Sequence, residues 1–285
     1  MKQRIITGAL FAIFMIAVAV LSGTLVYPFV FTLFSIIGAI EMLGCIGTRN
    51  SLIISVPSLI YAAVCPVIAY NFRYGVMFAI TSVYLVIMLT SLVFKNEKIK
   101  AEDVCTTFTM IAYTTICFSS LIRLRYVTTD VGADTGEIIG QFFFLLVFVA
   151  AWITDTFAYF TGVFFGKHKL CPKISPKKTI EGSMGGVIFC VAAFIIYGMA
   201  VAKLNPTLVP NYAGIAVVGL CMSVLSQMGD LLASVIKRTY GIKDYGNLFP
   251  GHGGVLDRFD SVLILAPFLL LLIEDAQYIS LFVKF

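Results

Sequence analysis

Charged side chains are scarce in this sequence: Asp, Glu, Lys and Arg together make up 12% of the 285 residues, while 60% are hydrophobic. A soluble domain carries roughly twice that charged fraction. The shortage excludes an ordinary water-soluble domain and indicates an integral membrane protein.

Other features are missing as well. The seven cysteines include no C-x-x-C pair and mostly lie in apolar segments, so we interpret them as small hydrophobic residues rather than metal ligands or disulfides. No basic run interleaved with aromatic residues lies outside the apolar segments, which argues against a nucleic-acid partner. The sequence also has no internal repeat, linker or low-complexity stretch. Membrane lipids are therefore the expected surroundings.

Long apolar runs are what the sequence does contain. Runs of about 20 residues predict membrane-spanning helices, and the fold class we expect is an all-α, polytopic membrane bundle of about nine such helices. Lys2 and Arg4 precede the first run, as in a signal peptide, but a second run follows directly, so we expect an uncleaved first span. The predicted spans lie near residues 5–21, 25–46, 52–70, 75–94, 104–122, 138–160, 185–203, 212–236 and 260–283.

Basic residues are distributed unevenly between the two sides of such a bundle. With nine spans, one side receives all but five of the 20 Lys and Arg residues. By the positive-inside rule this side is cytoplasmic, and it includes the N-terminus and the loops discussed below. The compact chain has no targeting extension, so we expect a bacterial inner membrane. The five basic residues on the other side are Arg73, Arg123, Arg125, Lys203 and Lys284.

The two halves of the chain differ in where their charges lie. In residues 1–135 the spans are almost free of charge, with Glu41 the exception near a span end. We expect this half to be a scaffold. Residues 136–285 carry the unusual polar segments and are the predicted catalytic region.

The first unusual segment runs over residues 223–261. An apolar run there carries a polar stripe at spacings of four and three residues, which places its members on one helical face. A carboxylate that faces lipid costs several kcal/mol, so Asp230 should face protein, water or a bound cation. The stripe consists of Ser223, Gln227, Asp230, Ser234 and Lys237.

A glycine-rich stretch, residues 249–254, follows this stripe among many charged residues. Glycines allow tight turns and close approach of the backbone to phosphate. If a helix begins near Leu256, Asp257 and Asp260 share its first turn. Carboxylates, cations and a glycine-rich backbone together indicate a divalent metal that holds a polyphosphate.

The second unusual segment runs over residues 152–186. Asp155 lies near the end of the sixth predicted span, and a loop with five lysines follows. Those lysines either enforce topology or hold an anionic ligand. For residues 175–179 we expect a proline turn just before a helix whose N-terminal N–H groups can receive phosphate.

Both segments resemble the phosphatidate cytidylyltransferases, also called CDP-diacylglycerol synthases. Their signature is S-x-x-K-R-x4-K-D-x-G-x2-[LIF]-P-x-H-G-G-x-x-D-R-x-D, and residues 155–182 follow a second family pattern that includes I-S-P-K-K-T-x-E-G. Three positions depart from the patterns: Phe157, Val163 and Ala233, the last where many members carry a glutamate. The signature is matched by Ser234, Lys237, Arg238, Lys243, Asp244, Gly246, Phe249, Pro250, His252, Gly253, Gly254, Asp257, Arg258 and Asp260.

The resemblance implies that CTP and phosphatidic acid react to give CDP-diacylglycerol and pyrophosphate. We expect Asp230 and Asp257 to be the primary Mg²⁺ ligands, supported by Asp260, and Asp155 to orient a lysine or hold a monovalent ion such as K⁺. His252 either contacts phosphate or has a structural role. A homodimer is also expected from the family. The predicted catalytic residues are Asp230, Asp257, Lys237, Arg238, Lys243 and Arg258, and the predicted substrate-binding residues are Ser175, Lys177, Lys178, Thr179, Ser234, His252, Gly253 and Gly254.

Alternative interpretations remain open. A CTP-dependent polyprenol kinase would use the same nucleotide, but it transfers the γ-phosphate to an alcohol and needs an evident base. A transporter would place charges near the membrane midplane, often in repeated halves. Asp230 can also form an ion pair with Lys237 or Arg258 without a metal, and for Ser223, Ser226 and Gln227 hydrogen bonding between helices is the favoured interpretation.

Overall fold

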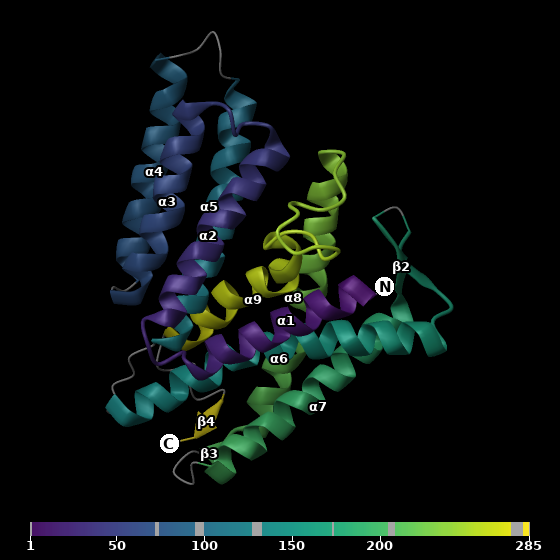
Figure 1. Cartoon of the computed structure of the whole chain (residues 1–285). Coiled ribbons are helices and arrows are strands. Elements are labelled where there is room, and N and C mark those ends of the chain that lie inside the picture. The colour runs from purple at the N-terminus through teal and green to yellow at the C-terminus, as the bar shows by residue number, and fades with distance from the viewer. Residues whose placement is uncertain are drawn as a thin grey trace. The chain divides into compact units, whose positions relative to one another are not determined.

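The computed structural model describes residues 2–71, 74–94, 100–126, 133–172, 174–204, 209–274 and 282–284. All nine predicted spans are helices within this part of the chain, which confirms the all-α fold class (Figure 1). The helices are α1 (Lys2–Val20), α2 (Val26–Ile46), α3 (Leu52–Asn71), α4 (Tyr74–Phe94), α5 (Ala101–Arg125), α6 (Ala133–Phe165), α7 (Ile180–Leu204), α8 (Tyr212–Thr239) and α9 (Leu256–Glu274).

Seven of these helices, α2 to α8, are long and apolar enough to cross a membrane. The apolar part of α1, Ile6–Val20, is shorter, and α9 carries four charged residues. The chain is therefore a multi-pass integral membrane protein. The last helix begins at Leu256, the start at which Asp257 and Asp260 share its first turn, and its described residues run to Glu274. Residues 275–281 of the predicted span lie outside the described residues.

Two short antiparallel ladders were not predicted. Strand β1 (Lys169–Cys171) pairs with β2 (Ser175–Thr179), and β3 (Val209–Pro210) pairs with β4 (Val283–Lys284). The prediction of a proline turn at residues 175–179 was wrong, because Pro176 lies inside strand β2. A proline is tolerated there since each strand of a two-stranded sheet has an edge that needs no N–H donor.

The described helices fall into two compact units. The first unit contains Met1–Tyr126 and Thr239–Phe259, and the second contains Val127–Arg238 and Asp260–Phe285. The glycine-rich segment thus belongs with the N-terminal helices, and α9 starts in the first unit and continues in the second. The predicted division at residues 135/136 concerned function, and it stays a prediction.

In the first unit, α2 to α5 pack into a bundle (Figure 1), and aromatic side chains form much of its core. Phe259 is 1% exposed, and its ring centroid lies 5.3 Å from that of Phe34 and 5.4 Å from that of Phe118. Such aromatic pairs add about 1 kcal/mol each beyond the area that they bury. The end of the glycine-rich segment is therefore anchored in this core.

In the second unit, α6 and α7 pack closely along small residues. A Cβ atom added to Gly185 would overlap the side chain of Thr161, and one added to Gly186 would lie 3.0 Å from the carbonyl oxygen of Thr154. Phe157, one of the departures from the family pattern, stacks on Phe189 with ring centroids 4.0 Å apart. This close packing holds α6 and α7 together at the end from which the β1–β2 hairpin extends.

Candidate active site

Lys178 of β2 and Asp230 of α8 form an ion pair. The Lys178 Nζ atom lies 2.5 Å from Asp230 Oδ2, and the two side chains are 24% and 30% exposed. The alternative to metal binding had named Lys237 or Arg258 as the ion-pair partner of Asp230, and Lys178 is a partner that it did not include. The pair joins the two motif segments through their charged side chains inside the second unit.

Two more carboxylates lie near this pair. The charges of Asp155 on α6 and Asp260 on α9 each interact with that of Asp230. Asp155 Oδ2 accepts a hydrogen bond from Ser261 Oγ at 3.1 Å, while Asp260 Oδ1 accepts one from the Ser261 N–H at 2.8 Å. Lys178 also interacts with Asp155, and Lys237 with Asp260. The second unit thus gathers three aspartates and two lysines.

A glycine on α8 permits this gathering. A Cβ atom on Gly229 would lie 2.8 Å from the carbonyl oxygen of Asp260 and 2.9 Å from the side chain of Ile264. Helices α8 and α9 therefore approach each other closely just beside Asp230. The stripe on α8 is confirmed as helical, and two of its members bond to neighbouring helices: Ser223 Oγ accepts from Thr154 Oγ1 at 2.9 Å, and Gln227 Nε2 donates to the Ser183 carbonyl at 3.4 Å.

The carboxylates near Asp230 are oxygen donors of the kind that Mg²⁺ prefers. In the described part of the chain, no group of three or more His, Cys, Asp or Glu side chains is arranged to hold a metal ion. Mg²⁺ in nucleotide sites commonly uses only one or two carboxylates and completes its shell with phosphate oxygens and water. The aspartates around Asp230 offer oxygen donors of this kind, so the residues fit the ion by their chemistry.

Asp257 closes the glycine-rich loop in the first unit. The Asp257 side chain is 6% exposed, and its Oδ2 atom accepts hydrogen bonds from the N–H groups of Tyr245 at 2.8 Å and Gly254 at 2.9 Å. Gly253 next to it has φ +81°, a conformation that favours glycine. Asp257 therefore has a structural role in this loop, and its predicted role as a metal ligand stays a prediction.

Glu41 on α2 is a residue whose role the sequence interpretation missed. It is 8% exposed, and its two carboxylate oxygens accept hydrogen bonds from the N–H groups of Val255 and Leu256, both at 2.9 Å. Its signal in the sequence was a lone carboxylate in an otherwise apolar span, which is costly unless the group has a partner. The N-terminal half of the chain thus supplies hydrogen-bond acceptors to the segment between the glycine-rich stretch and α9.

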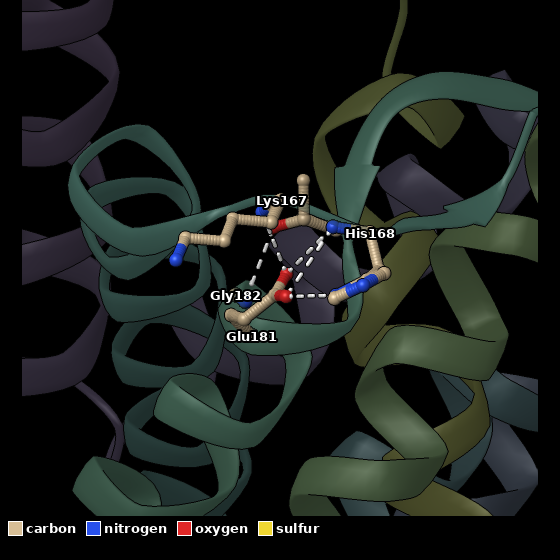
Figure 2. A network of polar contacts seen from close by, with 5 residues as sticks. Lys167, His168, Glu181 and Gly182 are labelled. Carbon is tan, nitrogen blue, oxygen red and sulfur yellow. Dashed lines mark hydrogen bonds and ion pairs between the residues drawn. The ribbon is translucent and has the colours of Figure 1, made fainter.

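Glu181, at the start of α7, holds the beginning of the cationic loop (Figure 2). Its Oε2 atom accepts the N–H groups of Lys167 at 3.1 Å and His168 at 3.2 Å, and its Oε1 atom lies 2.6 Å from His168 Nδ1. Thr179, predicted to bind phosphate, is 7% exposed and caps α7 by accepting the Gly182 N–H at 3.1 Å. These contacts fix the backbone where the chain leaves α6 for the hairpin and where it enters α7 from the hairpin.

The other predicted site residues differ in their exposure. Lys177, Arg238, Lys243 and Arg258 are exposed, whereas Ser175 and Ser234 are partly buried. His252 is partly buried as well, and among the described residues its Nδ1 atom has no hydrogen-bond partner. Exposed cations can reach a ligand from solvent, so the geometry permits their predicted role in phosphate binding.

Comparisons with known proteins agree with the motif patterns. Residues 2–275 match the model of the cytidylyltransferase family. The chain is similar to the phosphatidate cytidylyltransferase of Bacillus subtilis strain 168, with 32% identity over 280 residues that cover 96% of this chain and 97% of the relative. It is also similar to that of Staphylococcus haemolyticus (31% identity, 96% and 99% covered) and to that of Staphylococcus aureus strain COL (44% identity over 137 residues, 48% and 51% covered).

Proposed function

This chain belongs to the cytidylyltransferase family, and on that premise we propose that it is a phosphatidate cytidylyltransferase. It transfers CMP from CTP to phosphatidic acid and releases pyrophosphate. The observation that carries the proposal beyond the family match is the Lys178–Asp230 pair, since it brings a lysine of one motif to a carboxylate of the other.

The reaction joins two polyanions. A phosphate oxygen of phosphatidic acid, already negative at neutral pH, attacks the α-phosphorus of CTP, and the bond between that phosphorus and the oxygen leading to the β-phosphate breaks. No strong general base is needed, because the nucleophile carries no proton that must leave. Repulsion between the substrates is the main barrier, and cationic side chains lower it. Lys178 and Lys237 are supported in this role by their neighbouring aspartates.

Mg²⁺ is the proposed cofactor. Asp230 and Asp257 are the proposed primary ligands, with Asp260 in support; Asp230 and Asp260 are favoured by their proximity, and Asp257 is proposed on the signature alone. When bound, the ion would neutralise charge on the phosphates of CTP. Asp155 holds Lys178 in place or binds a monovalent cation such as K⁺, and its contact with Ser261 fixes its side chain for either role.

Exposed cations and residues of the glycine-rich loop are further groups that we propose to bind the substrates. Lys243, Arg238 and Arg258 bind the triphosphate and the departing pyrophosphate, as do the Gly253–Gly254 backbone and His252. The hairpin residues Ser175 and Lys177 hold the phosphate of either substrate. Thr179 and Ser234 contribute as a helix cap and as part of the α8 stripe, respectively.

The cellular setting is proposed from charge distribution and from the relatives. Most Lys and Arg residues fall on one predicted side, which supports a cytoplasmic N-terminus and cytoplasmic motif loops. The matching relatives are bacterial, which favours the bacterial inner membrane. A homodimer is proposed from the family resemblance alone.

Product analysis tests the function. Purified protein in detergent is incubated with CTP, phosphatidic acid and Mg²⁺, and the lipids are identified by mass spectrometry. We expect CDP-diacylglycerol and pyrophosphate in equal amounts, and a loss of about 100-fold or more in Asp230→Asn. Asp103→Asn, which changes a carboxylate outside both motif segments, is the matched control. Polyprenyl phosphate made from added polyprenol, with no CDP-diacylglycerol, would assign the protein to the lipid kinases instead.

A further inference from the structure

At the start of α9, the N-cap residue offers no side-chain acceptor. The N–H groups at a helix start need acceptors that the helix itself does not provide, and Ser, Thr, Asp or Asn usually supply one from the N-cap position. Here Val255 precedes the helix, and its side chain has no acceptor atom. Glu41 accepts the Val255 and Leu256 N–H groups with one oxygen each. A helix more than 200 residues earlier in the chain therefore caps α9.

Gly246 and Gly254, in the loop from Tyr245 to Asp257, lie directly against the Glu41 carboxylate. A Cβ atom on Gly254 would overlap Oε1 and Cδ of Glu41, and one on Gly246 would lie 2.5 Å from Oε1 and 2.9 Å from Cδ. The positive φ values in this part of the chain belong to Gly241, Gly251 and Gly253, not to Gly246 or Gly254. Backbone conformation therefore does not explain these two glycines, whereas the space that Glu41 occupies does.

The same loop is held from inside by Asp257, whose Oδ2 atom accepts the Tyr245 and Gly254 N–H groups. Two buried carboxylates thus receive four backbone N–H groups of one segment. Hydrogen bonds to ionised acceptors are about twice as strong as neutral ones. Neither carboxylate can leave without exposing buried donors, so the loop has one strongly favoured conformation.

We propose that Glu41 is a positioning residue of the nucleotide site: it caps α9, sets the conformation of the loop from Tyr245 to Asp257, and is the reason why positions 246 and 254 must be glycine. The inference rests on the proposed function in that this loop serves CTP. It adds to the expectation that Gly254 binds substrate, because Gly246 and Gly254 make room for a side chain of the protein itself.

Substitution of Glu41 tests the positioning role. Glu41→Gln keeps the size of the side chain but presents an NH₂ group to one of the two N–H donors. We expect kcat/KM for CTP to fall about tenfold or more, mainly through the KM for CTP, while the KM for phosphatidic acid stays unchanged. Glu102→Gln, an exposed glutamate of the same unit, should match the parent. A folded Glu41→Gln protein with parental CTP kinetics would overturn the proposal.

An exchange of sizes tests the contact itself. Gly254→Ala should lower the melting temperature and kcat/KM for CTP, whereas Gly44→Ala should not, because a Cβ there meets no atom within 4 Å. Glu41→Asp shortens the side chain by one methylene, so Glu41→Asp/Gly254→Ala should recover part of both losses. If Gly254→Ala lowers the melting temperature and kcat/KM as much in the Glu41→Asp protein as in the parent, Gly254 is needed for something other than the space that Glu41 occupies.

Enzyme kinetics and melting temperatures test this inference and the proposed function separately. If the parent protein transfers no CMP to phosphatidic acid, the proposed function fails, yet the melting temperatures of the exchange pair still support or contradict the contact between Glu41 and Gly254. If Glu41→Gln does not fold, Glu41→Asp, which retains the carboxylate, replaces it: a parental KM for CTP would contradict the positioning role, and a raised one would support it.

Discussion

Lys178 and Asp230 form an ion pair in which both side chains remain partly exposed. Pairs of this kind contribute at most about 1 kcal/mol to folding stability, so stability alone does not explain why the cationic hairpin reaches toward α8. A lysine held beside a carboxylate cluster is, in contrast, well placed to receive a phosphate. The pair therefore has more to do with substrate binding than with folding.

Lys178→Met separates these two roles. We expect kcat/KM to fall about 100-fold, while the melting temperature changes by no more than about 2 °C. Lys169→Met, an exposed lysine in the other strand of the same hairpin, is the control and should retain activity. Steady-state kinetics and thermal unfolding of both variants check this. A large loss of stability with parental kinetics would assign Lys178 to the fold instead.

Asp257 has two roles that substitution can distinguish. Asn keeps an oxygen that can accept the Tyr245 and Gly254 N–H groups, whereas Ala leaves both donors without that acceptor. We expect Asp257→Ala to lower the melting temperature by roughly 5 °C. Asp257→Asn should melt near the parent temperature but lose CMP transfer, since an amide is a poor ligand for Mg²⁺. An active Asp257→Asn protein would make Asp257 a structural residue only.

At the scale of helices and strands, local sequence patterns predicted much of the fold. Apolar runs located all nine helices of the described residues, because a chain in lipid must satisfy its backbone within each span. The β1–β2 hairpin was missed, since Pro176 indicated a turn and a strand of five residues has little periodicity of its own. The cap from Glu41 was missed for a different reason. It joins Glu41 to Val255 and Leu256, which follow it by 214 and 215 positions, and no local pattern encodes such a contact.

The same limit applies to the candidate site. The polar stripe named Asp230 and the signature named Asp260 and Lys237, and the second unit does bring these three together. Sequence spacing did not identify Lys178 as the partner of Asp230, because the two lie on separate elements, β2 and α8. It also did not indicate that Thr179 is a buried helix cap rather than an exposed hydroxyl.

The contact between α6 and α7 gives a prediction for these elements. A methyl group on Gly185 would overlap Thr161, so Gly185→Ala should cost about 1–3 kcal/mol of stability by overpacking. Thermal unfolding in detergent measures the loss. Gly75→Ala, where a Cβ atom meets nothing within 4 Å, is the matched control. Equal melting temperatures for the two variants would show that the helix pair tolerates wider spacing.

For the whole molecule, the orientation in the membrane is a prediction that chemical labelling can check. Lys169→Cys lies in the cationic loop on the expected cytoplasmic side, and Lys203→Cys lies near the end of α7 on the expected outer side; both positions are exposed. In intact cells an impermeant maleimide should label position 203 above the parent background but not position 169. Inside-out vesicles should give the reverse, and the opposite pattern would invert the topology.

The transfer of label from CTP tests the central claim most directly. The purified protein is given phosphatidic acid, Mg²⁺, an added polyprenol and CTP that carries label on either the α- or the γ-phosphate. We predict that the α label enters the lipid as CDP-diacylglycerol while the γ label leaves as pyrophosphate. Entry of the γ label into the polyprenol, with no α label in phosphatidic acid, would contradict the assignment as a phosphatidate cytidylyltransferase.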